Sequence, residues 1–348
     1  MDREKYFLKF IAKDLLGIEV GPWYSPVAPK AAGYRCLTLD VFDADTLRQL
    51  VLENEHIPDA VARNVEEVDL HGATGSLKAL VEAKGMLGQF DYVISSHNIE
   101  HLPDPLLFLQ NCGAVLKEGG VVSLAVPDRR TCYDYFRPLT MIGDWIAARY
   151  EGRIRPSAVQ AFNAGSLFAP FEVNGGPRTD FTLNDDPRRL MAPSGLLREF
   201  ELMQERLRSG DAEYHDTHCW TFTPASLLLL LVEARYLGLS PFDVIEVSPN
   251  NGLEFYAHLR NVGYAQRPTE HEQHLFNQKR LAMLHAAHSE AAANTLPVRE
   301  QAAEIQRLNS EMSSVIERCR EQQERIAALE NSTSWRVTAP LRWLRSLV

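Results

Sequence analysis

The stretch that decides the fold is QFDYVISSHNIEHLPDPLLFLQNCGAVLKEGGVVSLAVPDRR, residues 89–130. Its apolar and amphipathic runs predict a strand at 89–96, a helix at 105–117 and a second strand at 120–127. The two glycines between this helix and the second strand are expected to end the helix, since glycine adopts the left-handed cap conformation easily. A strand buried on both faces, then a helix and another strand, indicates a parallel sheet covered by helices.

The same alternation of predicted strands and helices precedes this stretch and is lost after it. Apolar runs predict strands at 17–20, 34–40 and 65–70, and a helical pattern covers 44–53. In residues 128–215, breakers such as NGGP, NDDP and MAPSG separate short helical pieces. We therefore expect this segment to be an insertion or lid over the open end of the sheet.

Regular structure returns after the insertion. Thr223 is expected to be the N-cap of a helix whose first residue is Pro224. Two β runs, FDVIEVSP at 242–249 and LEFYAHLRNV at 253–262, are joined by a turn that contains Asn-Asn-Gly, which is a hairpin signal. The globular domain is expected to span residues 1–265.

The segment 266–330 is rich in Glu, Gln, Ala, His and Arg and has no strand signal. It carries a four-heptad seam with one polar position: Ile305, Leu308, Met312, Val315, Cys319, Gln322, Ile326 and Leu329. This spacing favours a coiled coil, with a homodimer as its expected state. The alternative is one helix that packs back on the globular domain.

The segment 331–348, NSTSWRVTAPLRWLRSLV, contains two tryptophans and three arginines, and no acid follows Glu330. Trp, Leu and Val beside Arg suit a basic amphipathic tail in peripheral contact with an anionic membrane surface. The alternative is a tail that packs on the coiled coil or on a partner.

Composition excludes several classes of protein. Among 348 residues, 36 Lys and Arg stand against 46 Asp and Glu, which gives a formal net charge of -10 and argues against a nucleic-acid partner. The five cysteines form no CxxC pair, so a reducing compartment is expected. The N-terminus has acids among its bases and a lysine in its apolar stretch, unlike a secretory signal. The most apolar run, 227–232, is too short to cross a bilayer, so we expect a cytoplasmic protein.

Two positions at predicted strand ends are candidates for ligand binding. Gly21, after the first strand, lets the backbone approach a ligand, and Asp40 ends the second strand about twenty residues later, where a carboxylate can accept hydrogen bonds from ribose hydroxyls. The alternative is an ordinary turn that needs glycine for its conformation.

The segments together resemble class I S-adenosylmethionine-dependent methyltransferases of the type 11 kind. The similarity lies in the strand beginning Phe-Asp, the Glu-His turn, the helix ending in Leu-Lys-x-Gly-Gly and the strand ending in Pro within 89–130. FTPASL at 222–227 and the hairpin after it resemble the last helix and last strands of that family. The resemblance covers roughly 15–130 and 215–262. It implies an α/β, Rossmann-like, seven-stranded, mostly parallel sheet with an antiparallel last strand, and S-adenosylmethionine as cofactor.

The resemblance also implies roles for individual residues at the cofactor. Glu19 and Gly21, with Pro22, would meet the methionine end and the ribose, and Asp40 would bind the ribose hydroxyls. Asp69 would lie near the adenine, and Ser96 and His97 would line the sulfonium pocket. The chain departs from the family pattern at Trp23, which stands where a second glycine is usual.

Two histidine-rich motifs are candidates for chemistry. His97-Asn-Ile-Glu100-His101 matches the HxxEH pattern of inverted zinc proteases, but two nearby prolines oppose the long helix which that chemistry needs. His101 has either a functional role or a structural one in the turn. His215-Asp-Thr-His218-Cys offers metal-ligand types, a general base for a hydroxyl acceptor, or an ordinary structural role. We therefore name His97, His101, His215 and His218 as candidate catalytic residues, and expect no bound metal.

Arg129, Tyr133 and Arg137 follow the strand at 120–127, on the side of a parallel sheet where ligands bind. Arginine and tyrosine there suit a sugar or phosphate-bearing acceptor, and the alternative is a solvated turn with aromatic packing. These three residues are the candidate substrate-binding set.

The resemblance implies methyl transfer to an acceptor oxygen. SxSWRxTAPLRxL resembles the tail of bacterial glycosyltransferases and methyltransferases of surface-polysaccharide assembly. That similarity implies a sugar hydroxyl in an O-antigen or capsule-like chain as acceptor, and glycosyltransferases as partners. Two other hypotheses remain: a catalytically silent scaffold that dimerises and recruits glycosyltransferases, and a metal-dependent hydrolase that uses His97, Glu100 and His101.

Overall fold

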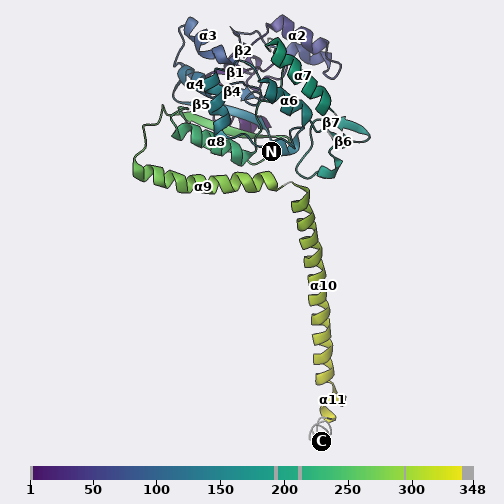
Figure 1. Ribbon diagram of the computed structural model, residues 1–348. Coiled ribbons are helices and arrows are strands. Elements are labelled where there is room, and N and C mark those ends of the chain that lie inside the picture. The colour runs from purple at the N-terminus through teal and green to yellow at the C-terminus, as the bar shows by residue number, and fades with distance from the viewer. Residues whose placement is uncertain (1–2, 192–194, 211–213, 294, 339–348) are drawn as a thin grey trace. The chain divides into compact units, whose positions relative to one another are not determined.

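One sheet of seven strands organises the chain (Figure 1), in the order β3-β2-β1-β4-β5-β9-β8. Its strands are β1 Leu16–Val20, β2 Arg35–Asp40, β3 Leu70–His71, β4 Phe90–Ser96, β5 Leu116–Pro127, β8 Phe242–Val247 and β9 Glu254–Asn261. The pairs among β1 to β5 are parallel, and β9 is antiparallel to both β5 and β8. The expected mostly parallel sheet with an antiparallel last strand is confirmed. The computed structural model describes residues 3–191, 195–210, 214–293 and 295–338.

The central strands are buried on both faces, as their apolar runs predict. In β4, Val93 belongs to the core on one face, and Tyr92 and Ile94 belong to the core on the other. A close approach accompanies this packing, because a Cβ placed on Gly17 of β1 would lie 2.0 Å from the ring of Tyr92. Glycine at this position therefore lets the tyrosine lie flat against the neighbouring strand.

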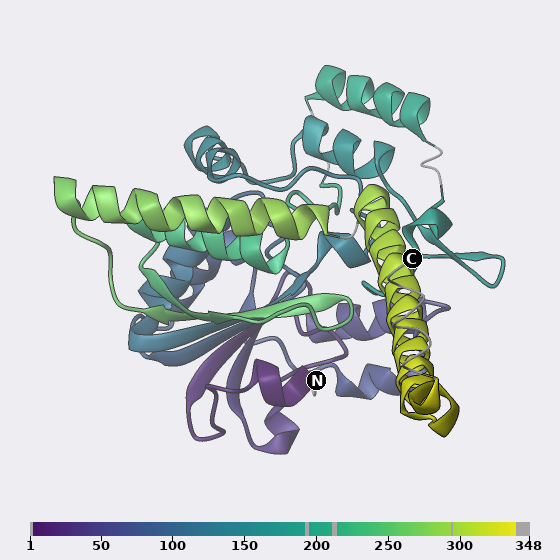
Figure 2. The ribbon, with the colours of Figure 1, turned by 90° about the horizontal axis from the view of Figure 1, so that it is seen from below.

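Four helices cover one face of the sheet and contribute to its larger core: α3 Leu77–Ala83, α4 Pro105–Val115, α5 Ile142–Glu151 and α8 Pro224–Tyr236. The other face is covered by α1 Arg3–Phe7 and the loops around Ile11 and Val27. Helix α2 Ala44–Leu52 packs with the 3-10 turn η2 Asp59–Asn64 in a separate small cluster. Figure 2 shows the twisted sheet with these layers around it.

The segment 128–215, expected to be an insertion or lid over the sheet, contains several helices and turns and one hairpin. It contains the turn η4 Arg129–Thr131, helix α5, helix α6 Ala158–Ser166, the hairpin β6 Phe171–Val173 with β7 Gly176–Arg178, the turn η5 Pro187–Arg189, and helix α7 Leu196–Ser209. Trp145 of α5 is fully buried in the main core. The insertion therefore supplies part of the hydrophobic core besides any covering role.

Two predicted boundaries are wrong. The strand expected at 65–70 is β3, whose only residues are Leu70 and His71, because η2 and the residues after it occupy the preceding stretch. The helix expected to reach 117 ends at Val115, because Leu116 is buried and pairs with Phe90 as the start of β5. Consequently the two glycines there lie within β5 and do not cap α4.

Later boundaries agree with the sequence. Thr223 accepts a hydrogen bond from Ser226 N–H and is the N-cap of α8, with Pro224 as its first residue. The hairpin of β8 and β9 turns through Gly252, whose φ is 78°. Both features are confirmed.

The first compact unit is Met1–Ala292 and the second is Ala293–Val348, so the division falls later than the expected boundary at 265. The reason is α9 Glu270–Ala292, which runs alongside α8 in both views (Figure 1; Figure 2). The rings of Phe276 and Tyr236 stack with centroids 3.5 Å apart, and Arg280 Nε donates to Glu233 Oε1 at 2.5 Å.

The second unit consists of helix α10 Leu296–Asn331 and helix α11 Thr333–Val337. The predicted heptad seam lies on α10, where its aliphatic and methionine side chains are 47–60% exposed. Their exposure leaves the coiled coil and the dimer as predictions. Residues 339–348 of the basic tail lie outside the described part of the chain. Among the described helices, none combines the length and apolar content that crossing a bilayer requires.

Candidate functional site

The candidate site lies at the carboxyl ends of the parallel strands, where open α/β sheets bind their ligands. Strand β4 ends at Ser96 and β5 at Pro127. Strand β9 runs the opposite way, so its first residue, Glu254, pairs with Pro127 at this same edge. Two loops, 97–104 and 128–137, leave the sheet here.

The loop after β1 has the backbone conformation expected of a glycine-rich turn. Gly21 has a φ of 59°, and no atom lies within 4 Å of the place where a Cβ would stand. Pro22 follows, and its carbonyl accepts from Ser25 N–H at 2.9 Å. Trp23 also adopts a left-handed backbone, with φ 44°, while its indole Nε1–H donates to Leu47 O of α2 at 3.1 Å. The tryptophan thus keeps a glycine-like backbone conformation and anchors its indole to α2.

Glu19, which the resemblance places at the methionine end and ribose of the cofactor, has backbone partners in the loop that follows its own strand. It is buried in β1, and its two oxygens accept hydrogen bonds from Val27 N–H at 2.7 Å and Ala28 N–H at 3.0 Å. Burial raises the pKa of Glu19 to about 7, against the lowering effect of the two backbone donors. Its carboxylate therefore closes the loop 21–28 onto β1.

Asp40 and Asp69 differ in what their carboxylates contact. Asp40 ends β2 at the edge, where one oxygen accepts from Phe42 N–H at 3.1 Å and burial raises its pKa. Asp69 precedes β3 instead of ending a strand, and its Oδ2 accepts from Thr38 N–H at 2.8 Å and from Lys30 Nζ at 2.6 Å. Asp69 thus ties a loop to β2, and its expected position at the end of a strand is wrong.

Ser96 and His97 lie at the end of β4 as expected and belong to a chain of polar contacts. Arg3 Nη2 donates to Ser96 Oγ at 2.9 Å, and Arg3 Nε donates to Glu254 Oε1 at 2.7 Å. His97, with φ 47°, places Nε2 2.8 Å from Glu254 Oε2. Burial alone would lower the pKa of His97, but the bond to Glu254 and the nearby Glu100 raise it. Burial would raise the pKa of Glu254, but bonds from His97, Tyr256 and Arg3 lower it to about 2.

A denser group, which we call the histidine cluster, lies beside these residues: Glu100, His101, Tyr133, Asp134, Asp216 and His218. In it each histidine is paired with a carboxylate. His218 Nδ1 lies 2.5 Å from Asp134 Oδ2, and His101 Nδ1 lies 2.8 Å from Asp216 Oδ1. The two imidazole rings meet edge to face with centroids 4.6 Å apart. Tyr133 OH lies 2.8 Å from His218 Nε2.

Backbone hydrogen bonds explain how distant segments form this cluster. Cys219 N–H and Trp220 N–H both donate to Glu100 O, at 2.6 and 3.1 Å. The indole Nε1–H of Trp220 donates to Leu102 O at 2.5 Å. These bonds fix residues 218–220 along the turn after β4, so His218 must lie next to His101.

Electrostatics of the cluster are dominated by its acids. Burial alone would raise the pKa of Asp134, but His218 and Arg137 lower it. The hydrogen bond from His101 lowers the pKa of Asp216. Burial alone would lower the pKa of His101, but Asp216 and Glu100 raise it. The acids of the histidine cluster therefore favour positive charge on its imidazoles.

The two arginines predicted to bind substrate have structural contacts instead. Arg129 Nη1 donates to the carbonyls of Tyr135 at 2.7 Å and Arg137 at 2.6 Å. Arg137 is buried and donates to Asp134 Oδ1 at 2.7 Å. Both guanidinium groups therefore hold the loop 128–137 in place. Tyr133 reaches the cluster, as described above, while its ring stacks on Phe168.

Sequence reasoning missed three acids of this edge, Asp134, Asp216 and Glu254. It named Glu100 only for the alternative of a metal-dependent hydrolase, and Asp216 stood inside a motif of which only the histidines were taken as catalytic candidates. Asp134 and Glu254 carried no local signal, since their partners are distant in sequence. His215 is not among the residues that converge with Glu100, His101 and His218.

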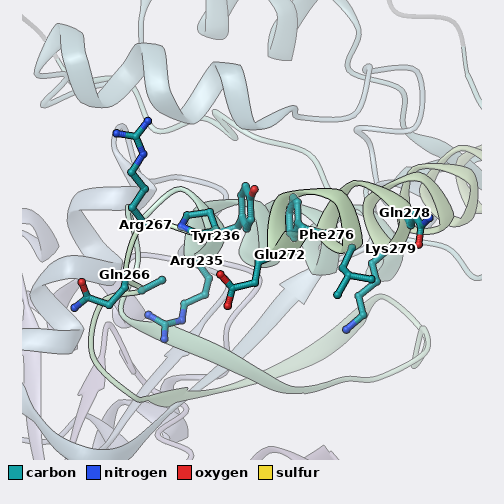
Figure 3. A pocket seen from close by; sticks show the side chains of 11 residues that line it. Arg235, Tyr236, Gln266, Arg267, Glu272, Phe276, Gln278 and Lys279 are labelled. Atoms are coloured by element: carbon teal, nitrogen blue, oxygen red, sulfur yellow. The ribbon is translucent and has the colours of Figure 1, made fainter. Parts of the chain in front are cut away.

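A cavity of about 630 Å³ lies elsewhere, between the end of α8, residues 265–268 and α9. Figure 3 shows the stacked Tyr236 and Phe276 beside Arg235, Arg267 and Lys279 in its wall. These side chains lie at the C-terminal end of the 13-residue α8, whose N-terminal end adjoins the strand edge. At 1.5 Å per residue this is a separation of about 18 Å, so the cavity is not part of the candidate site.

Comparisons with known proteins agree with this fold. Residues 16–239 match a family described as a methyltransferase domain. A stretch of 77 residues is 31% identical to a ubiquinone biosynthesis O-methyltransferase from Parvibaculum lavamentivorans, and covers 20% of this chain and 30% of that protein. The chain thus spans less than a third of the length of that relative.

Solved structures show a looser likeness. An S-adenosylmethionine dependent methyltransferase from Mesorhizobium loti is 12% identical with a TM-score of 0.36, over 74% of this chain and 98% of that one. A SAM-dependent methyltransferase from Methanosarcina mazei is 13% identical with a TM-score of 0.35, over 74% and 97%. Because the family match alone covers well over half of the sequence, this chain belongs to the methyltransferase-domain family.

Proposed function

We propose that this protein transfers a methyl group from S-adenosylmethionine to an oxygen of an acceptor, a reaction of class EC 2.1.1. One observation carries the proposal: Asp40 and the open turn at Gly21 lie at the same strand edge as His97 and the histidine cluster. A cofactor at β1 and β2 would therefore share its strand edge with the groups proposed to meet the acceptor.

The residues present fit S-adenosylmethionine on the side of β1 and β2. The left-handed Gly21 leaves open space where a side chain would project, so a ligand can approach the backbone. The Asp40 carboxylate, at the end of β2, would accept hydrogen bonds from two ribose hydroxyls. Ser96 ends β4, and the next residue, His97, places its Nδ1 3.6 Å from Glu100 Oε1 of the histidine cluster.

The cofactor supplies an activated methyl group on a sulfonium. The acceptor oxygen would form a bond to the methyl carbon as the sulfur–carbon bond breaks, and the hydroxyl proton would pass to a histidine of the cluster or to solvent, leaving S-adenosylhomocysteine. The protein's task is to align the two substrates and exclude water, since orientation supplies much of the rate when the leaving group is already activated.

The acceptor in this proposal is a sugar hydroxyl of a surface polysaccharide, with glycosyltransferases as partners. A pocket of histidine and carboxylate groups suits a polyhydroxylated acceptor, and the tail motif described above adds a similarity in sequence. We also propose a homodimer through α10, a cytoplasmic location, and peripheral membrane contact through residues 331–348.

Calorimetric titration of the purified, chelator-treated chain with S-adenosylmethionine and S-adenosylhomocysteine tests the cofactor. We expect dissociation constants on the order of micromolar, weakened about tenfold or more by Asp40→Ala, because a charged hydrogen-bond acceptor is lost. The control is Asp45→Ala, an exposed acid on α2, which should bind as the wild type does. No binding by folded wild type would overturn the proposal and favour the silent scaffold.

A further inference from the structure

Glu100 is a buried acid of the histidine cluster whose carboxylate has no hydrogen-bond partner among the described residues. Its side chain is 0% exposed, and both of its carboxylate oxygens lack such a partner. A buried polar group without a hydrogen-bond partner destabilises the folded protein, and the more so when it is charged. Native proteins seldom keep such a group without a use for it, such as a bound ion.

The two histidines beside Glu100 are oriented as metal ligands are. In each ring Nδ1 faces a carboxylate, Asp216 for His101 and Asp134 for His218, which fixes the tautomer and leaves Nε2 as the ligand atom. A carboxylate behind a histidine is the usual outer partner of a metal-bound imidazole, since it orients the ring and raises its basicity.

We propose that Glu100, His101 and His218 bind one divalent metal ion of the zinc class. A ligand atom from each of the three lies within 4.8 Å of the other two, and Glu100 Oε1 is 3.9 Å from His101 Nε2. Two ligands of a tetrahedral zinc ion stand about 3.4 Å apart, given bonds of about 2.1 Å. Small rotations of these side chains would close the site.

The charges and the ligand types agree with this assignment. Three carboxylates, Glu100, Asp134 and Asp216, surround the two imidazoles. Arg137 is paired to Asp134, and His97 Nδ1 lies 3.6 Å from Glu100 Oε1. A divalent ion would balance the remaining negative charge. One carboxylate with two imidazoles is the ligand set of zinc sites that keep a fourth position open.

The open coordination position would give the metal ion a catalytic role. That role rests on the proposed function, whereas the binding of the metal ion does not. An acceptor hydroxyl bound there would have a lower pKa, as water does on zinc. Its proton would pass to solvent, and the metal-held oxygen would attack the methyl carbon as the sulfur–carbon bond breaks. Tyr133 OH, now 2.8 Å from His218 Nε2, would move aside for the ion.

Titration of the chelator-treated, full-length chain with ZnCl2 and with CoCl2 tests the site. We expect one equivalent of zinc per chain, and visible absorption bands of tetrahedral cobalt that zinc abolishes. Glu100→Gln and His218→Gln should each weaken zinc binding at least tenfold. The matched control is His215→Gln, in the same segment as His218, which should bind zinc as the wild type does.

Asp216→Asn provides a second test that does not depend on a buried substitution, since the Asp216 side chain is 72% exposed. Loss of this outer partner should weaken zinc binding about 10–100-fold. A folded wild type without stoichiometric zinc, or equal affinity in Glu100→Gln, His218→Gln and wild type, would overturn the proposal. S-adenosylhomocysteine titration of the same samples keeps the two proposals separate: binding of it without zinc would refute only the metal site, and zinc without it only the cofactor.

Discussion

The two halves of the strand edge use their acids differently. Beside β1 and β2, Glu19 and Asp69 have their carboxylates satisfied by backbone N–H groups, and they shape loops. Beside β4 and β5, Asp134 and Asp216 orient histidines, and the buried carboxylate of Glu100 accepts no hydrogen bond from any residue that the structure describes. A satisfied carboxylate stabilises the fold, whereas an unsatisfied buried one marks a place that is open to a ligand.

The largest expected effect lies in the β4–β5 half. Asp134→Ala removes the partner of His218 and leaves Arg137, which is buried, without its counter-ion. A buried charge that loses its partner destabilises a protein by about 3–5 kcal/mol. Asp216→Ala removes an exposed carboxylate and should cost no more than about 1 kcal/mol. Urea denaturation of both variants measures the loss in free energy of unfolding. Equal losses in the two variants would contradict the distinction between the two acids.

A smaller effect should depend on pH. Glu254 has its pKa lowered from 4.5 to about 2, so its contribution to stability is present above pH 4.5 and is lost as the pH falls from 4.5 towards 2. The contribution is on the order of 3 kcal/mol, since each pKa unit corresponds to about 1.4 kcal/mol. Wild type should exceed Glu254→Gln by this amount at pH 6, and most of the gap should vanish at pH 3. A gap that is independent of pH in urea denaturation would refute this role.

In the β1–β2 half we expect a still smaller change in stability, in which glycine is favoured over alanine. At an ordinary position alanine is favoured over glycine, but Trp23 has a left-handed backbone that glycine adopts without strain. Trp23→Gly and Trp23→Ala lose the same indole bond to Leu47 O. We therefore expect the glycine variant to be more stable by about 1 kcal/mol. An alanine variant of equal or greater stability by thermal denaturation would show that this backbone relaxes when the indole is removed.

The smallest effect on stability should come from a region outside both halves. Leu308→Asp places a charge in the exposed seam of α10 and should convert a dimer to a monomer, while the unfolding of the first unit changes by less than about 0.5 kcal/mol. Ser310→Asp, off the seam, should leave the mass unchanged. Sedimentation measures this, and a wild-type monomer would refute the coiled-coil dimer.

Sequence patterns predicted the sheet because the signal for a parallel strand is local. The apolar runs before Ser96 and Pro127 and the hairpin turn at Gly252 gave the strand edge and its last strands correctly. The short β3 was misplaced, because two residues carry too little periodicity to separate them from a preceding turn.

Side-chain partners at the site were less predictable for a physical reason. His218 and Asp134 are 84 residues apart, and His97 and Glu254 are 157 apart, so no spacing rule connects them. Glu19 looked like a cofactor ligand by position, yet the amides of the loop after β1 bind it. A sequence shows which groups reach the edge, and the fold decides which of them already have partners.

The bonds from residues 219 and 220 to the turn at Glu100 also set the order of events at the ribosome. Glu100 emerges more than a hundred residues before His218, which at typical elongation rates is a delay of roughly ten seconds. Throughout that interval the strands from β1 to β5 can pair, but the histidine cluster is incomplete. A nascent chain therefore acquires its scaffold first and its reactive pocket only when synthesis has passed Trp220.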